Sequence, residues 1–166
     1  MSGAETSTTG TANVSTLNGA KLSNVAAAEV LRRLRRFLIV LALFLFGGAL
    51  VELWLVGHTE DVIQWLAFAL AGAGALSVTL TLFHFSRATV RLLRVCMLVI
   101  VLGSLFGMYE HVSGNIALAR EVQPNSTTAQ LFWRGLQGGN PLLAPGVLAV
   151  AAVLALSATY RYEVKT

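Results

Sequence analysis

Residues 37–56 read FLIVLALFLFGGALVELWLV, a run of twenty residues that contains a single charged side chain, Glu52. As an α-helix this run would measure about 30 Å, which matches the hydrocarbon thickness of a bilayer. Immediately before the run stand four arginines, Arg32, Arg33, Arg35 and Arg36. The sequence therefore predicts a first transmembrane span over about residues 33–57, with a basic end at one membrane surface.

The composition of the whole chain agrees with a membrane protein and not with a water-soluble domain. Of its 166 residues, 55% are hydrophobic and only 12% are charged, whereas soluble domains average about 25% charged residues. Cys96 is the only cysteine. Intramolecular disulfides, a thiol oxidoreductase that needs cysteine pairs, and cysteine-rich metal sites are therefore excluded.

Three further apolar segments follow the first, and each is long enough to cross a bilayer. They occupy about residues 61–86, 91–112 and 141–161. The predicted fold class is an all-α membrane protein, a four-transmembrane-helix bundle within residues 25–162. We expect a disordered cytoplasmic tail over residues 1–24, which are rich in Ser, Thr and Gly, and a short C-terminal tail over 163–166.

The connection between the third and fourth spans, residues 113–140, is the one long loop of this prediction. Within it, the stretch from Thr127 to Gln130 has the form of a capping box, which is typical of a helix start. Apolar residues then alternate with polar ones at helical spacing. We expect a short amphipathic helix that lies at the outer membrane surface, with Trp133 at the interface.

Basic residues are distributed unevenly between the two predicted sides of the membrane. Ten of the twelve lysines and arginines fall on the side of the termini, and only Arg120 and Arg134 fall on the other. The positive-inside rule therefore predicts an N-in/C-in topology. The residues that determine it are Arg32, Arg33, Arg35, Arg36, Arg87, Arg91 and Arg94. Because they flank the spans, we expect contact with the lipid bilayer and no binding of nucleic acid.

Glu52 is the single charged residue within the first apolar segment. It lies five residues before the end of the first span, where a charged group is costly. Gly48 lies one helical turn before Glu52, and glycine allows close approach of a neighbouring helix. We therefore expect Glu52 to face another helix of the bundle.

The third span places polar residues at the same predicted depth. Gly103, Gly107 and His111 are spaced four residues apart, so the glycine face that packs against other helices also carries His111 and its neighbour Glu110. We therefore predict a polar cluster near the outer face, and its members are Glu52, Glu110, His111 and Asn115.

An imidazole with two or three carboxylates is a ligand set for a transition metal. The candidate metal ligands are Glu52, Glu110, His111 and His58. His58 and His111 are also the two histidines at one depth that a haem would require. Adjacent residues on a helix diverge by about 100°, which weakens the metal interpretation. A buried polar network that fixes the helix register explains the same cluster without a cofactor.

The sequence favours a non-enzymatic membrane subunit or accessory protein, acting as a homo-oligomer or within a larger membrane complex. Two alternatives remain open at this point. One is a metal- or haem-linked membrane redox protein, and the other is a proton-coupled carrier of small solutes that uses Glu52. The frequent Ala, Leu, Val and Arg residues are typical of bacterial proteins, which predicts location in the cytoplasmic membrane of a prokaryote.

Overall fold

The structure is a computed structural model that describes residues 8–57, 62–139 and 143–160. The described part of the chain is all-helical, as predicted, and its helices are α1 (Thr8–Leu55), α2 (Val62–Phe83), α3 (Arg87–Val122), α4 (Thr128–Gln137) and α5 (Leu143–Ala158). His58 and the C-terminal tail predicted for residues 163–166 lie outside the described residues.

Three helical segments of the described residues are long and apolar enough to cross a membrane. They are Lys21–Leu55, Gln64–Phe83 and Arg87–Val122. The apolar part of α5, Pro145–Ala158, is shorter. The all-helical architecture with long apolar helices is therefore the part of the predicted fold class that the structure confirms.

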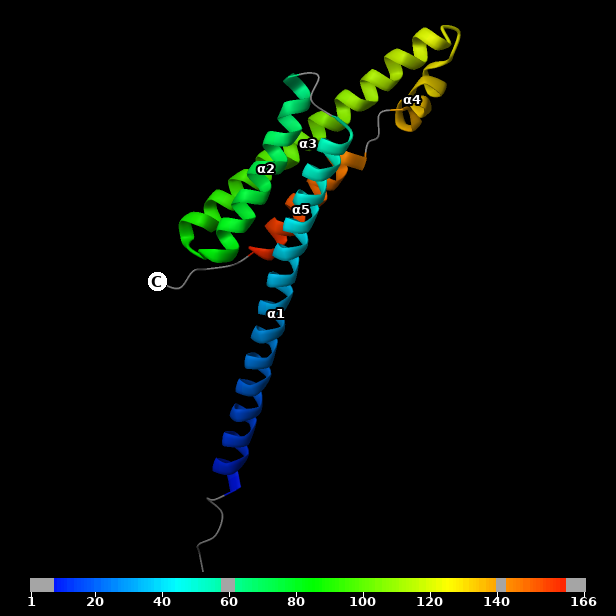
Figure 1. The fold of residues 1–166 in the computed structure, drawn as a ribbon. Coiled ribbons are helices and arrows are strands. Elements are labelled where there is room, and N and C mark those ends of the chain that lie inside the picture. Colours follow the sequence, from blue (N-terminus) through cyan, green and yellow to red (C-terminus); the bar gives the residue numbers. More distant parts are fainter. Residues whose placement is uncertain (1–7, 58–61, 140–142, 161–166) are drawn as a thin grey trace, which may run out of the picture.

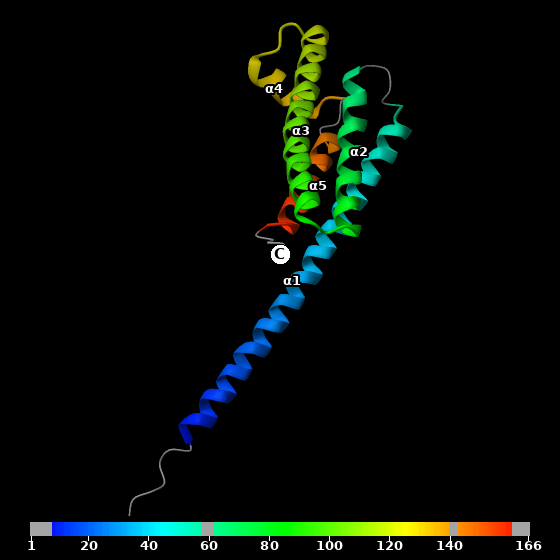
Figure 2. The ribbon, with the colours of Figure 1, turned by 90° about the vertical axis from the view of Figure 1, so that its left-hand side faces the viewer.

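The four apolar helices pack side by side, with α2 and α5 each lying against both α1 and α3 (Figures 1 and 2). Within the described ranges, no Cα atom of α1 lies within 8 Å of a Cα atom of α3, so these two helices lie diagonally opposite each other. The α1 residues that face this core recur every three or four positions, as one face of a helix requires. They are Ile39, Ala42, Phe46, Ala49 and Leu53.

Glycines allow the apolar helices to approach closely. A Cβ atom on Gly74 of α2 would lie 2.6 Å from the ring of Phe46 in α1, and one on Gly103 of α3 would lie 2.6 Å from Leu70 in α2. A Cβ atom on Gly107 would touch α5 at 3.4 Å. The predicted packing of the third span through Gly103 and Gly107 is therefore confirmed.

The two basic clusters of the sequence meet at one end of the molecule. Arg35 of α1 donates a hydrogen bond to the carbonyl of Tyr160 at 3.1 Å, and Arg94 of α3 donates to the carbonyl of Thr159. Both carbonyls lie in the turn directly after α5, beside the helix end that carries a partial negative charge. These two arginines therefore fasten α1 and α3 to the end of α5.

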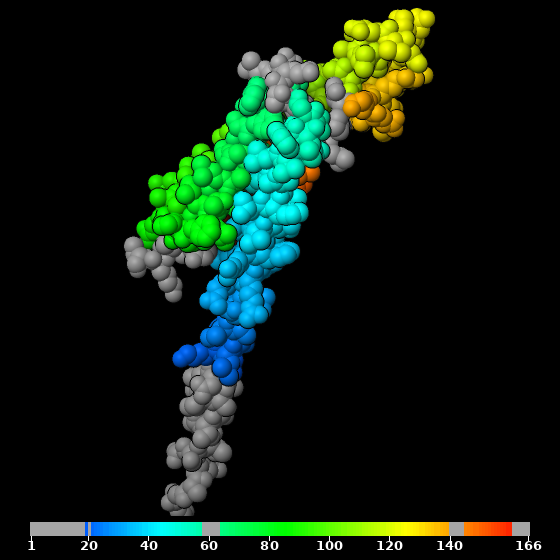
Figure 3. All heavy atoms as spheres, viewed as in Figure 1, coloured from blue at the N-terminus to red at the C-terminus, as the bar shows by residue number. Residues whose placement is uncertain are grey.

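Two helices are longer than the sequence predicted. Residues 8–24, expected to be disordered, form the first part of α1, which extends beyond the other helices (Figures 1 and 2). In Figure 3 the blue part of α1 stands clear of the other helices. Once a helix is nucleated, each added residue gains one hydrogen bond, so the apolar segment supports extension toward the N-terminus. At the other end, α3 continues to Val122 and does not stop at 112, because tertiary contacts described below hold residues 113–122 in the helix.

Candidate functional site

The C-terminal part of α3 and the short helix α4 form a hairpin that stands clear of the other helices (Figures 1 and 2). The turn between them ends at the predicted capping box, which the structure confirms. The hydroxyl of Thr127 accepts a hydrogen bond from the backbone N–H of Gln130, and the amide oxygen of Gln130 accepts one from the backbone N–H of Thr127. These two bonds satisfy backbone donors that a helix start otherwise leaves unpaired.

Asn115 joins the two helices of this hairpin. Its side chain is 3% exposed, and its Nδ2 donates a hydrogen bond of 3.0 Å to the backbone carbonyl of Gly135. A Cβ atom on Gly135 would lie 2.5 Å from Ile116, and one on Gly138 would collide with Asn115 itself. Gly135 of α4 and Gly138, the residue after its end, therefore allow the close approach that brings the Asn115 amide within hydrogen-bonding distance.

The apolar residues of α4 point in two directions. Leu131 and Gly135 are buried against α3, whereas Phe132, Trp133 and Leu136 are exposed. The rings of Phe132 and Trp133 contact each other edge to face, with centroids 6.0 Å apart. The predicted amphipathic helix is thus present, but part of its apolar surface packs on α3 and does not face outward.

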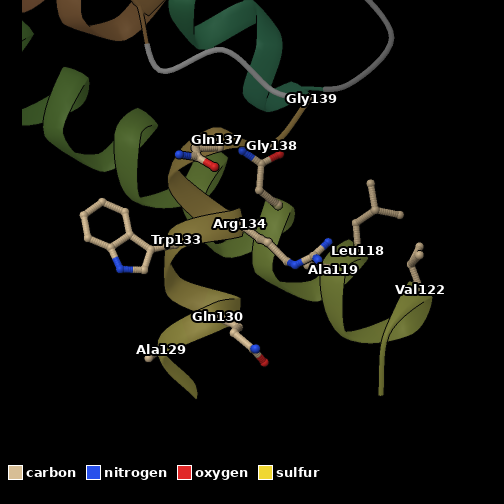
Figure 4. Close-up of a pocket in the computed structure, with 11 residues that line it drawn as sticks. Leu118, Ala119, Val122, Ala129, Gln130, Trp133, Arg134, Gln137, Gly138 and Gly139 are labelled. Atoms are coloured by element: carbon tan, nitrogen blue, oxygen red, sulfur yellow. The ribbon is translucent and has the colours of Figure 1, made fainter. Parts of the chain in front are cut away.

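A pocket of about 700 Å³ opens between the two helices of the hairpin (Figure 4). On the α3 side it is lined by Asn115, Leu118, Ala119 and Val122. On the opposite side the lining residues belong to α4 and to the two glycines that follow it. They are Ala129, Gln130, Trp133, Arg134, Gln137, Gly138 and Gly139. Arg134 extends from α4 toward Leu118 and Ala119 of α3 (Figure 4).

The structure places Glu52 on α1 and the other three predicted cluster residues on α3. Glu52 is exposed on α1, whereas Glu110 and His111 are half-buried on α3 and Asn115 is buried in the hairpin. No described Cα atom of α1 lies within 8 Å of one of α3, so the structure does not place Glu52 beside the other three residues. No hydrogen bond or ion pair joins the Glu52 carboxylate to another described residue.

The predicted metal site required Glu52 to lie close to Glu110 and His111. The haem alternative required His58 and His111. In the part of the chain that the structure describes, no three His, Cys, Asp or Glu side chains are grouped so that they could hold a metal ion. His58, the other candidate ligand, lies outside that part.

Gly48 was the reason to expect that Glu52 faces another helix of the bundle, and its surroundings in the structure do not support that expectation. A Cβ atom on Gly48 would meet nothing within 4 Å, so this glycine faces away from the other helices of the chain. Glycine spacing indicates a face on which backbones can approach, but not whether the neighbour belongs to the same chain.

The pocket was not predicted, because residues 113–122 were assigned to a loop, although Asn115, Gln130 and Trp133 were named for other reasons. The spacing that could have identified the α3 side of the pocket is visible along α3. His111, Asn115, Leu118 and Val122 follow one another at intervals of four, three and four residues, which continues the helical face of the third span.

The described residues contain three helices that are long and apolar enough to cross a membrane. These helices indicate that the chain is a membrane protein. Comparison with known proteins does not assign the chain to a family. No family model matches the chain, and no curated protein and no solved structure matches it.

Proposed function

We propose that this protein is a non-enzymatic subunit or accessory component of a membrane complex. The exposed carboxylate of Glu52 within the apolar segment of α1 is the observation that carries this proposal. A carboxylate that faces hydrocarbon costs up to about 3 kcal/mol near the centre of a bilayer and less toward its edge. A second protein surface that covers Glu52 removes this cost.

The surface beside Glu52 has room for such a neighbour. Gly48 lies one turn away on the same side of α1, it is exposed, and a Cβ atom there would touch nothing. Glycine on an open helix face lets a partner helix come close enough for its backbone or polar groups to reach the carboxylate. The partner is a second copy of this chain or another membrane protein.

The proposed topology has four spans, formed by α1, α2, α3 and α5, with both termini in the cytoplasm. Two observations support it. The arginines of α1 and α3 gather at the C-terminal end of α5, as a single cytoplasmic surface would require. Helix α5 is apolar and packs between α1 and α3, and its 16 residues reach about 24 Å, close to the hydrocarbon thickness.

In this orientation the α3–α4 hairpin lies on the outer side of the cytoplasmic membrane of a prokaryote. The exposed Phe132, Trp133 and Leu136 of α4 support a position near the membrane surface, where aromatic side chains are enriched. Cysteines introduced by Ser126→Cys and Thr166→Cys in a Cys96→Ser background test the topology. Reagent added outside should label position 126 and not position 166, and the reverse result would invert the topology.

The partner surface is tested with Gly48→Leu, which adds a side chain beside Glu52 at a position where a Cβ atom would meet nothing within 4 Å. We expect the wild-type protein, extracted with native lipids, to run in native mass spectrometry above its own 17.7 kDa. The Gly48→Leu protein should run as the monomer, with an unchanged thermal unfolding midpoint.

Gly72→Leu is the matched control, because a Cβ atom on Gly72 of α2 also meets nothing within 4 Å. This variant should keep the complex. The proposal fails if the wild-type protein is already monomeric in native lipid, or if Gly48→Leu leaves the complex intact. The mass of the complex identifies the partner as a second copy or as a different protein.

A further inference from the structure

The pocket between α3 and α4 has the size of a ligand site. Its volume of about 700 Å³ falls within the range of roughly 300–1,000 Å³ that is typical of small-molecule sites. The pocket belongs to the α3–α4 hairpin and does not include Glu52, so its occupant is independent of the partner proposed for α1.

One wall of the pocket is apolar. Leu118 and Val122 of α3 are 57% and 69% exposed, and Ala119 lies between them in the same wall. Ala129 adds an apolar group from the start of α4. An alkyl chain laid along this wall would remove apolar surface from water, which a small polar ligand such as free phosphate would leave exposed.

The other wall offers hydrogen-bond donors and a positive charge. Arg134 and Gln137 line it, and no Asp or Glu is among the lining residues. The guanidinium of Arg134 has no ion-pair partner among the described residues. The amide oxygen of Gln130 is engaged in the capping box, so its NH₂ group is the part that can serve a ligand. This set of groups favours an anion.

We propose that the α3–α4 pocket binds an amphiphile with an anionic head group and an alkyl chain. The head group, a carboxylate or a phosphate, pairs with Arg134, because guanidinium binds both through paired hydrogen bonds. The alkyl chain lies against Leu118, Ala119 and Val122. A free fatty acid and an anionic phospholipid both have this chemistry, and the experiment distinguishes them.

Trp133 lines the pocket, so its fluorescence can report the binding of a ligand there. In a protein that carries Trp54→Phe and Trp65→Phe, Trp133 is the one remaining tryptophan, because the chain has three. Bromine atoms on an alkyl chain quench tryptophan fluorescence on contact. The full-length protein in phosphatidylcholine nanodiscs is titrated with dibromostearate. Separately prepared nanodiscs contain brominated phosphatidylglycerol or brominated phosphatidylcholine in increasing proportion.

We expect saturable quenching by an anionic probe, weakened about tenfold or more by Arg134→Gln, since a hydrogen bond to a charged group is lost. Arg120→Gln is the control, because Arg120 is exposed on α3 and does not line the pocket. It should leave the quenching unchanged. Ala119→Leu, which narrows the pocket while keeping Arg134, should also weaken the quenching.

Quenching that is limited to dibromostearate identifies a fatty acid as the ligand, and quenching that is limited to brominated phosphatidylglycerol identifies a phospholipid. Quenching by both anionic probes shows that the head-group charge is recognised in either molecule. Equal quenching by brominated phosphatidylcholine, or quenching that Arg134→Gln does not change, would overturn the proposal. Neither result depends on whether the Glu52 surface of α1 has a partner.

Discussion

The apolar helices and the α3–α4 hairpin both pack around glycines, yet different interactions hold them together. Between α2 and α1, Gly74 receives the ring of Phe46, and the surrounding buried residues are mostly apolar. In the hairpin, Gly135 receives Ile116, and Asn115 adds a hydrogen bond to the Gly135 carbonyl. The capping box of Thr127 adds two more bonds.

This difference follows from the surroundings proposed for each region. In hydrocarbon, each helix satisfies its backbone hydrogen bonds internally, and association depends on the fit of side chains, since lipid tails are as apolar as the helix surfaces. In water, a ten-residue helix such as α4 is too short to be stable alone. It therefore requires capping and tertiary hydrogen bonds. Substitutions that disturb side-chain packing should destabilise the apolar helices. Substitutions that remove polar groups should destabilise the α3–α4 hairpin.

The largest effect is expected for Gly74→Leu. The added side chain would begin 2.6 Å from the Phe46 ring, which must move within a packed core. Overpacking of this kind lowers the free energy of unfolding by about 1–3 kcal/mol. Thermal unfolding in detergent measures it. Gly72→Leu, with no atom within 4 Å of the new Cβ, serves as the control and should leave the midpoint nearly unchanged. Equal midpoints for the two variants would contradict the packing of α1 on α2.

An effect of similar free energy, but confined to the α3–α4 hairpin, is expected for Asn115→Ala. The change leaves the Gly135 carbonyl without its donor at a buried position, which costs about 1–3 kcal/mol. Hydrogen–deuterium exchange should show faster exchange in α4 and little change in α1 and α2. Asn125→Ala, at an exposed position in the turn, is the matched control and should exchange like the wild type. Protection of α4 that survives Asn115→Ala would show that this bond does not hold the hairpin.

The smallest effect is expected for Thr127→Ala, which removes one half of the capping box. Loss of a helix cap of this type costs about 1 kcal/mol. The first turn of α4 should exchange faster, with no change in the thermal midpoint of the whole protein. Thr128→Ala makes the same chemical change one residue later, inside the helix. If both variants exchange alike, the capping box does not stabilise α4.

The apolar segments and the α4 cap could be predicted because both depend on residues close in sequence. The predicted span of 61–86 contains α2, Val62–Phe83, and the pattern from Thr127 to Gln130 identified the start of α4. The start of α3 was placed too late, because Ser86 forms its capping box with Thr89 and not with the Glu or Gln that usually marks this motif.

The end of α3 and the position of Glu52 could not be predicted, because both depend on distant contacts. The stretch Ser113-Gly114-Asn115 reads as a helix stop, and only the bond between Asn115 and Gly135 of α4 shows why the helix continues. For Glu52, Gly48 indicated a packing face, but α2 and α5 occupy the other side of α1. The remaining polar residues, Glu110 and His111, lie on α3, which is diagonally opposite α1.

Because α3 is one continuous helix, a rotation at one of its ends displaces the other end. Its 36 residues contain no proline, the usual cause of a kink, and span about 54 Å from Arg87 to Val122. A tilt of about 10° at the basic end would carry the tip of the hairpin through about 9 Å, with the pocket moving as one body with it. A change in how the basic end of α3 sits against α5 would thus be transmitted mechanically to the α3–α4 hairpin.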